Sequence, residues 1–369
     1  MRIMICISSL GAGGAERDVA MLAPALIQSG HHVMVVYSSG GVYEERLRAF
    51  GVPITRISDG QHHSPQVLWR FIRAVRSFRP HVIHSWLTQM DVLSGVTAWM
   101  FGVPHVMSEL SSALMYPDTW KHRLRIRMGR RAKVIASNSA GGQEYWRAHA
   151  PLTAQRIIPN GLPLNEIAAA EPGLPAGLVL PDDAKLIAFV GRLHTEKRAT
   201  TFAHAVVGLL QDPRIALMCG EGPEYGAIAS IARAANVGSR LILPGFVTNV
   251  WGVFKRADVF VNVSGYEGRP NAVIEAMACG CPVVVSDIPA HREILGPDEA
   301  VFVDGSDPES IAAGIRIVLD NPDAARGRAS RARSRTASWS VGVMAAAYES
   351  VYGDILSTVP HGVSRPVAS

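Results

Sequence analysis

This sequence of 369 residues lacks long apolar runs, cysteines at metal-ligand spacing and the acidic triplet D-x-D. No apolar stretch reaches the roughly 18 residues that a transmembrane helix needs, so any membrane contact is expected to be peripheral. The run from Met1 to Ser8 is too short for a secretory signal, which favours a strand there and a cytoplasmic protein. The four cysteines lie in apolar segments without metal-ligand spacing, so we expect buried thiols and no metal site: Cys6, Cys219, Cys279 and Cys281.

Charge is divided unevenly along the chain, although the net charge is only +5. Residues 1–180 carry 18 Lys and Arg against 11 Asp and Glu, whereas residues 181–369 carry 18 against 20. Much of the excess lies in residues 121–133, which predict either a solvated helix or a platform for anionic lipid headgroups or a lipid-diphosphate acceptor. The second reading would place the protein at the inner face of the plasma membrane. Nucleic acid is disfavoured, because no aromatic platforms are interleaved with these charges.

Short apolar runs alternate with helical patterns along almost the whole chain, which predicts an α/β protein with parallel sheets. A concentration of proline and glycine at residues 162–184 interrupts the alternation and indicates a domain boundary. We therefore expect two doubly wound, Rossmann-like domains, residues 1–164 and 165–338, with a ligand cleft between them. Residues 339–369 are expected to form a final helix and a loose tail.

The most informative segment, residues 264–286, reads as strand, loop, helix and strand. Pro270 suits the start of the helix and Gly280 its end, which leaves Glu267 in the loop and Glu275 about one turn inside the helix. A helix N-terminus favours phosphate, and neighbouring carboxylates can accept hydrogen bonds from sugar hydroxyls. The segment thus predicts a site for a nucleotide sugar.

Two cations, Arg192 and Lys197, follow the first strand of the second domain and should lie beside the same phosphate position. Cleavage of a sugar–phosphate bond leaves negative charge on the diphosphate, which fixed cations stabilise in the transition state. We therefore expect these two residues and Glu267 to be catalytic.

A glycine-rich loop follows the first strand of the chain and holds Gly11, Gly13, Gly14 and Glu16. It is similar to a dinucleotide fingerprint, but Glu16 stands where a small residue is needed, and no acidic residue ends the second strand. A dehydrogenase is therefore disfavoured. The loop can still approach a diphosphate or an acceptor.

These segments, in this order, resemble family 4 of the retaining glycosyltransferases, which have the GT-B fold. The resemblance covers nearly the whole chain and includes Ile158-Pro159-Asn160-Gly161, Gly220-Glu221-Gly222-Pro223, Pro244-Gly245-Phe246 and the E-x7-E pair Glu267 and Glu275. It implies that Arg192 and Lys197 bind the donor diphosphate, Glu267 the donor sugar and Glu275 the ribose, while the last helix returns to the first domain. It also implies that neither a metal nor a cofactor is needed, which agrees with the lack of a D-x-D triplet. The remaining residues expected at the donor are Gly191, Gly222, Phe246, Val247, Gly268, Arg269, Asn271 and Ala272.

The sequence departs from the family pattern at two places. Many relatives have Gly-Phe-Gly after the first glutamate, where this chain has Gly268-Arg269-Pro270, and many have His at the position of Ser108. The candidates for contact with the acceptor are His84, Ser108, Glu109 and Asn160. A structural role is an equal alternative for His84, which ends a predicted strand.

Four classes of function compete. The leading one transfers a hexose or N-acetylhexosamine from a nucleotide-diphosphate sugar, with UDP favoured over GDP, to a glycan, lipid-linked or small-molecule acceptor. A nucleotide-sugar epimerase of the same fold would need no acceptor, and its characteristic carboxylates are not evident. A hydrolase that uses Glu267 and Glu275 leaves Arg192 and Lys197 unexplained. A non-catalytic binding protein would not need the charged set.

Overall fold

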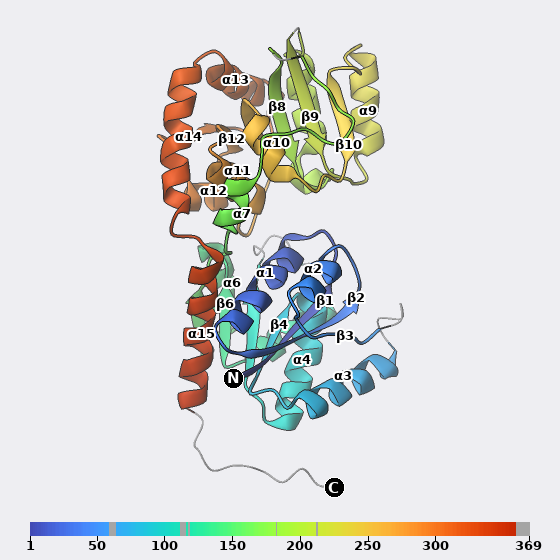
Figure 1. Ribbon diagram of the computed structural model, residues 1–369, viewed down its shortest axis with the longest axis vertical. Coiled ribbons are helices and arrows are strands. Elements are labelled where there is room, and N and C mark those ends of the chain that lie inside the picture. Colours follow the sequence, from blue (N-terminus) through green and yellow to red (C-terminus); the bar gives the residue numbers. More distant parts are fainter. Residues whose placement is uncertain (59–63, 111–115, 117–118, 182, 212, 359–369) are drawn as a thin grey trace. The chain divides into compact units, whose positions relative to one another are not determined.

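The computed structural model describes residues 1–58, 64–110, 116, 119–181, 183–211 and 213–358 (Figure 1). The chain forms two compact units, Met1–Gly161 together with the last helix, and Leu162–Ser340. The chain crosses from the first unit to the second after Gly161 and returns after Ser340. The predicted boundaries, after residues 164 and 338, lie three residues beyond the first crossing and two residues before the second. Leu162 pairs with Ser340 as an isolated parallel bridge, so both crossings between the units are adjacent. Residues 359–369, most of the predicted loose tail, lie outside the described residues.

The first unit is a seven-stranded parallel sheet in the order β3-β2-β1-β4-β5-β6-β7. Neighbours of β1 lie on both sides of it, with Ile5 opposite Val35 of β2 and His84 of β4, so the strand order reverses between β1 and β4. Its elements are β1 (Arg2–Ser9), α1 (Gly14–Gln28), β2 (His32–Ser39), α2 (Tyr43–Ala49), β3 (Ile54–Arg56), α3 (Pro65–Phe78), β4 (Val82–Trp86), α4 (Thr88–Phe101), β5 (His105–Glu109), α5 (Trp120–Gly129), β6 (Val134–Ser137), α6 (Ala140–His149), β7 (Ala154–Ile157) and α15 (Val341–Ser357).

The second unit is a six-stranded parallel sheet in the order β10-β9-β8-β11-β12-β13. Its strand order reverses between β8 and β11, which pair at Ile187 and Val259. Its elements are α7 (Leu164–Ala169), β8 (Lys185–Val190), the 3-10 helix η2 (Thr195–Lys197), α8 (Ala199–Val207), β9 (Arg214–Cys219), α9 (Tyr225–Ala234), β10 (Leu241–Gly245), α10 (Val250–Arg256), β11 (Val259–Asn262), α11 (Asn271–Cys279), β12 (Val283–Ser286), α12 (Pro289–Ile294), β13 (Val301–Val303), α13 (Pro308–Leu319) and α14 (Pro322–Thr336). The predicted α/β class with two parallel sheets is confirmed.

Local signals set the ends of α3 and α11. In α3, the Ser64 side chain accepts a hydrogen bond from the backbone N–H of Gln66 and Pro65 occupies the first turn. In α11, Pro270 precedes the first turn, and Gly280 ends the helix in the left-handed conformation with φ of 74°. A glycine adopts this conformation without the steric penalty that a Cβ atom would bring.

The helix α15 belongs to the core of the first unit, although it is the last helix of the chain. It packs against α1 (Figure 1) and buries an apolar stripe at helical spacing. That stripe comprises Met344, Ala345, Tyr348, Val351, Tyr352 and Ile355. Buried side chains from β1, β2, α1 and α15 thus form one continuous cluster.

Candidate active site

Three loops of the second unit meet at the carboxyl edge of its sheet, where the strand order reverses. They follow β8, β9 and β11, and backbone hydrogen bonds join them: Gly191 N to Cys219 O at 3.0 Å, Leu193 N to Glu221 O at 2.9 Å and Gly265 N to Glu196 O at 2.8 Å. In open parallel sheets, ligands bind in the crevice outside the carboxyl ends of the strands at such a reversal.

Glycines at the end of β9 allow this close approach of backbone to backbone. A Cβ atom on Gly220 would lie 1.9 Å from the carbonyl oxygen of Gly191, and one on Gly222 would lie 2.3 Å from that of Leu193. Gly220 also has φ of 143°. No other residue fits at these two positions without displacing the loop that holds the predicted phosphate ligands.

Lys197 and Glu267 form an ion pair across the strand reversal. The Nζ atom of Lys197 lies 2.5 Å from Oε1 of Glu267, and the Ser264 hydroxyl donates to the same oxygen at 2.7 Å. Burial alone would raise the pKa of Glu267, but the Lys197 ammonium and the two hydrogen bonds hold that pKa below its ordinary value. The side chains are 22% and 11% exposed, so a charged pair at this site remains accessible to a ligand.

Arg192 lies in the same group of loops but points outward. Its guanidinium pairs with Glu196, and its side chain is 66% exposed. Glu196 in turn lies within 3.4 Å of the hydroxyl of Tyr266, in the loop that holds Glu267. Both predicted cations therefore flank one loop cluster, with Lys197 paired inside it and Arg192 at its rim.

The helix α11 presents its N-terminus to this cluster, and no side chain caps it. Glu275 lies one turn inside and is only 2% exposed. Arg269 is buried in the preceding loop, with its guanidinium 4.5 Å from the ring centroid of Trp339. Among the residues predicted to bind the donor, Phe246 is exposed, whereas Val247 packs partly into the core.

A buried histidine that the sequence did not single out lies behind the ion pair. His291 Nδ1 is 2.8 Å from the carbonyl oxygen of Ser286, whose hydroxyl donates to the carbonyl of Ser264 at 2.7 Å. Burial lowers the pKa of His291, so its imidazole is neutral at physiological pH. This chain of contacts ends at Glu267 and fixes the loop that carries it. The only signal in the sequence was a histidine five residues after the end of a strand.

In the first unit, Glu16 folds back over the glycine-rich loop. The Ser9 hydroxyl donates to its carboxylate at 2.6 Å and accepts from the backbone N–H of Gly11 at 3.2 Å. A Cβ atom on Gly13 would lie 2.1 Å from Oε2 of Glu16, and Gly14 begins α1. A carboxylate at this position repels phosphate and attracts hydroxyl groups.

Comparisons with known proteins agree with this architecture. Residues 12–166 match the family described as Glycosyltransferase Family 4, and residues 174–335 match Glycosyl transferases group 1. The chain belongs to family 4 of the glycosyltransferases. It is therefore a glycosyltransferase of a retaining family, which takes its sugar from a nucleotide sugar, and it has the GT-B fold.

Two relatives and one solved structure show how far the likeness extends. A Campylobacter jejuni enzyme named N-acetylgalactosamine-N,N'-diacetylbacillosaminyl-diphospho-undecaprenol 4-alpha-N-acetylgalactosaminyltransferase is 24% identical, over 90% of this chain and 94% of its own. A GDP-mannose-dependent alpha-(1-6)-phosphatidylinositol dimannoside mannosyltransferase of Mycobacterium tuberculosis is 32% identical over 42% of this chain and 40% of its own. The structure of HepE from Anabaena with UDP and glucose aligns with a TM-score of 0.82 and 16% identity, over 96% of this chain and all of its own.

In this glycosyltransferase, two of the predicted acceptor contacts, His84 and Ser108, form hydrogen bonds within the first unit. His84 is fully buried, with Nδ1 2.7 Å from the hydroxyl of Tyr352 and Nε2 2.7 Å from that of Ser108. The Ser108 hydroxyl also lies 3.2 Å from that of Tyr348. These contacts join β4 and β5 to α15, so the structural alternative for His84 fits the geometry better than contact with an acceptor.

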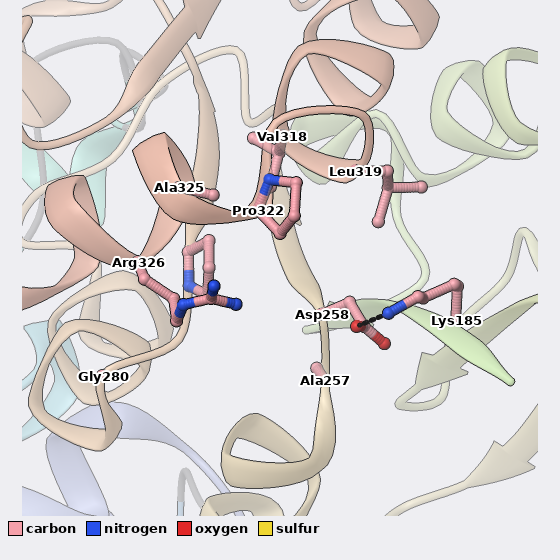
Figure 2. Close-up of a pocket in the computed structure, with 10 residues that line it drawn as sticks. Lys185, Ala257, Asp258, Gly280, Val318, Leu319, Pro322, Ala325 and Arg326 are labelled. Atoms are coloured by element: carbon pink, nitrogen blue, oxygen red, sulfur yellow. Dashed lines mark hydrogen bonds and ion pairs between the residues drawn. The ribbon is translucent and has the colours of Figure 1, made fainter. Parts of the chain in front are cut away.

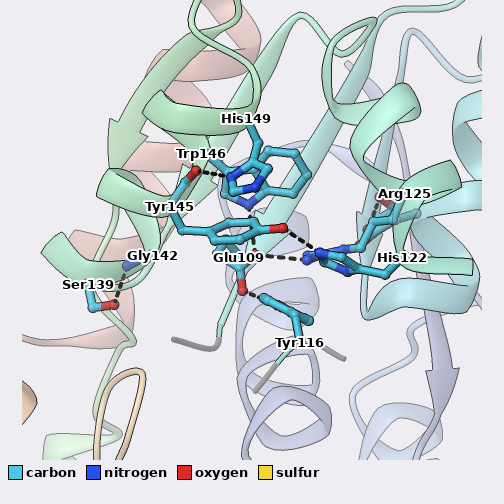
Figure 3. Close-up of polar contacts among 11 residues, drawn as sticks. Glu109, Tyr116, His122, Arg125, Ser139, Gly142, Tyr145, Trp146 and His149 are labelled. Carbon is cyan, nitrogen blue, oxygen red and sulfur yellow. Dashed lines mark hydrogen bonds and ion pairs between the residues drawn. The ribbon is translucent and has the colours of Figure 1, made fainter. Parts of the chain in front are cut away.

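Glu109 also lies inside the first unit, in a buried polar network (Figure 3). One of its oxygens accepts from Arg125 at 2.9 Å and from the indole N–H of Trp146 at 2.7 Å, and the other from Tyr116 at 2.5 Å. Arg125 pairs in addition with Asp91 at 2.6 Å. Since both Glu109 oxygens are occupied and the side chain is fully buried, the predicted contact of Glu109 with an acceptor has no support from the geometry. Asn160 is also buried, just before the first crossing between the units.

Two cavities of the second unit differ in their relation to the loop cluster. One, of about 220 Å³, lies at the amino edge of the sheet and is lined by Lys185 and Asp258, which pair with each other at 3.1 Å (Figure 2). The other, of about 380 Å³, lies beside the ends of β12 and β13 and is lined in part by Arg198, the residue after Lys197. Only the second adjoins the proposed catalytic residues. The described part of the chain contains no cluster of three or more residues suited to holding a metal ion.

Proposed function

We propose that this glycosyltransferase binds a UDP-sugar at the strand reversal of its second unit and transfers a hexose or N-acetylhexosamine. The observation that carries the proposal is the ion pair of Lys197 with Glu267, which lies beside the N-terminus of α11 and in the same loop cluster as Arg192. The same small region thus offers positive charge for a diphosphate and a carboxylate for sugar hydroxyls.

In this proposal Arg192 and Lys197 hold the diphosphate together with the amides that begin α11. As the bond between the sugar and the phosphate breaks, negative charge grows on the diphosphate, and two cations already in place stabilise it. The exposed Arg192 can turn from Glu196 toward the ligand, because little of its side chain is packed. Removal of one such group from an enzyme lowers kcat by about 10²–10³-fold.

Glu267 is proposed to orient the donor sugar. Its low pKa keeps the carboxylate ionised at neutral pH, and an ionised carboxylate can only accept hydrogen bonds. It therefore selects a hydroxyl or amide N–H of the sugar. Glu275 is proposed to hold the ribose, and the other donor contacts are proposed to be Gly191, Gly222, Phe246, Val247, Gly268, Arg269, Asn271 and Ala272.

The preference for UDP over GDP is supported by the solved structure of HepE with UDP and glucose. The relative that is named as GDP-mannose-dependent matches less than half of this chain, whereas HepE aligns with nearly all of it. Phe246 is proposed to contact the base, since its ring is 47% exposed next to the end of β10.

The acceptor is proposed to bind in the first unit at the glycine-rich loop. Glu16 supports hydroxyl recognition there and opposes a second phosphate site, because its carboxylate covers Gly13. The Campylobacter jejuni relative is named for an acceptor on diphospho-undecaprenol, and we propose a glycan or lipid-linked acceptor for this chain as well.

The reaction is proposed to take place in the cytoplasm, at the inner face of the plasma membrane. All four cysteines are free thiols, as is usual in a reducing compartment. No helix among the described residues is long and apolar enough to cross a membrane.

The test is a thermal-shift panel of UDP-, GDP- and ADP-sugars on the wild type and on Glu267→Ala. A ligand that binds the folded state raises the unfolding temperature, so UDP-sugars should stabilise the wild type most. Failure of every nucleotide to stabilise the wild type would remove the donor assignment. Conversion of a UDP-sugar without any acceptor would instead indicate the alternative function, a nucleotide-sugar epimerase.

A further inference from the structure

One face of the first unit combines exposed cations with exposed tryptophans. It is formed by α3, by the end of α4 and by α5 with the residues that follow it, and we call it the basic-aromatic face. Three tryptophans stand out from it, Trp69, Trp99 and Trp120, and they are 60%, 68% and 70% exposed. Its exposed cations are Arg73, Arg76, Arg79, Lys121, Arg123, Arg127, Arg130, Arg131 and Lys133.

Contacts between cations and rings join the parts of this face. The guanidinium of Arg76 on α3 lies 5.7 Å from the ring centroid of Phe101 at the end of α4. That of Arg131, just after α5, lies 5.5 Å from the ring of Trp99 on α4. The three helices therefore present one continuous surface, and not three separate patches.

Few acidic side chains occur in the described part of this face. Among the described residues of α3, α4, β5 and α5, the acidic ones are Asp91 and Glu109, and both are buried against Arg125. The exposed charged side chains of α3, α4 and α5 are therefore all cations, and their fields add.

The usual roles of surface cations do not account for the tryptophans. Arg76 and Arg127 lie in the last turns of α3 and α5, where a cation stabilises the helix dipole. The helix dipole does not explain why the apolar side chains of Trp99 and Met100, in the last turn of α4, are more than half exposed. Tryptophan is enriched where an apolar ring can sit at the boundary between lipid headgroups and hydrocarbon.

We propose that the basic-aromatic face docks on an anionic lipid bilayer, with the tryptophans in the headgroup layer and the cations against the lipid phosphates. The segment 121–133 contributes only part of this surface, since His122 and Arg125 point into the protein. Two kinds of attraction act together, which stable attachment to a membrane generally requires. The proposal rests on the first unit and does not depend on the donor site.

The test measures binding to sedimented vesicles of phosphatidylcholine with 30% phosphatidylglycerol, and to vesicles of phosphatidylcholine alone. The full chain should bind the anionic vesicles at least tenfold more tightly. The variant Arg73→Gln, Arg127→Gln, Arg131→Gln should weaken binding about a hundredfold, since each cation near an anionic surface contributes roughly fivefold. Trp99→Ala with Trp120→Ala should weaken the binding that remains at high salt, where charge attraction is screened.

The helix α14 supplies a matched control, because it is rich in exposed arginines but carries no exposed aromatic side chain. Arg326→Gln, Arg331→Gln, Arg333→Gln removes the same charge and should change binding less than about threefold. Equal losses from both triple variants would overturn the proposal, as would absence of binding to anionic vesicles. Tighter binding to a single-stranded oligonucleotide than to vesicles would assign the face to nucleic acid instead. Both triple variants should keep the thermal shift with UDP, which separates this test from that of the donor site.

Discussion

Replacement of Lys197 by methionine should slow the reaction and also change its dependence on pH. Methionine has a similar length but no charge, so the variant removes the cation that faces Oε1 of Glu267 at 2.5 Å. The loss of one group that stabilises the transition state should lower kcat about 10²–10³-fold. Because the two side chains are partly exposed, the loss of the pair should cost about 2 kcal/mol of folding stability, between the values for surface and buried pairs.

The change in pH dependence follows from the forces on Glu267. Burial raises the pKa of this carboxyl, and Lys197 is the strongest opposing influence. Without the cation, burial dominates, so the folded-state pKa rises. In the wild type, the low pKa contributes stability above the pKa of the unfolded chain, and this contribution is lost as pH falls through the folded-state value. In Lys197→Met, the acidic limb of kcat/KM should therefore move to higher pH.

The assay is nucleotide release with donor and acceptor present, measured from pH 5 to 8, beside thermal unfolding without ligand. Lys185→Met provides the control, because Lys185 pairs with Asp258 at 3.1 Å at the opposite edge of the same sheet. It should leave kcat and the pH profile unchanged. A Lys197→Met enzyme with normal kcat, or one with an unshifted acidic limb, would refute the assigned role of the pair.

Three further predictions concern the buried networks of the first unit and the donor loop of the second. Arg125→Met should destabilise the protein by about 3–5 kcal/mol, read from denaturant unfolding, because it leaves two buried carboxylates without their cation; unchanged stability would contradict the network. Burial lowers the pKa values of His84 and His105 to about 3, so both imidazoles are neutral in the folded protein above that pH. The stability that this contributes above pH 6.5 should be lost as pH falls from 6.5 to 3, by about 1.4 kcal/mol per pH unit for each histidine. His84→Gln should remove about half of this dependence of the unfolding free energy on pH, measured by denaturant unfolding at several pH values. Gly220→Ala should abolish the thermal shift with UDP, because its Cβ atom would overlap the carbonyl of Gly191; a normal shift would show that this loop does not shape the donor site.

The strands of the second unit can be predicted almost to the residue, because each is a short apolar run between turn formers; these runs are 186–190, 214–219, 241–243, 259–263, 282–286 and 300–303. In the first unit, β3 and β7 cannot be predicted in this way. Both are short edge strands, and their exposed or half-buried side chains leave no apolar run to detect. The helix α14 cannot be predicted from the sequence either, because it buries only small side chains such as Ala325, Ala329 and Ala332 under an arginine-rich surface. Periodicity of large apolar residues cannot reveal a helix of that kind.

The predicted donor residues could be placed at one edge because parallel strands all end on the same side of a sheet. The sequence shows directly that Lys197 and Glu267 each follow a strand. That was enough to predict that the two side chains lie close together. It could not indicate His291, whose contact with that loop passes through Ser286 and Ser264. Such contacts depend on which side chains of neighbouring strands face each other, and no spacing in the sequence encodes them.

Glu109 and Glu267 show why position alone could not separate structure from function. Both are glutamates at or just beyond the end of a central strand, and both were predicted to touch a substrate. What differs is the countercharge. Arg125 comes from a helix that packs on the sheet, and it is as fully buried as Glu109, so every hydrogen bond of that pair is used inside the protein. Lys197 comes from the loop cluster itself and stays partly exposed, so its bond to Glu267 can be exchanged for a bond to a ligand. A cation whose partner can be replaced by a diphosphate is what the proposed transfer requires, and of these two pairs it is that of Lys197 and Glu267 that lies beside the N-terminus of a helix, α11.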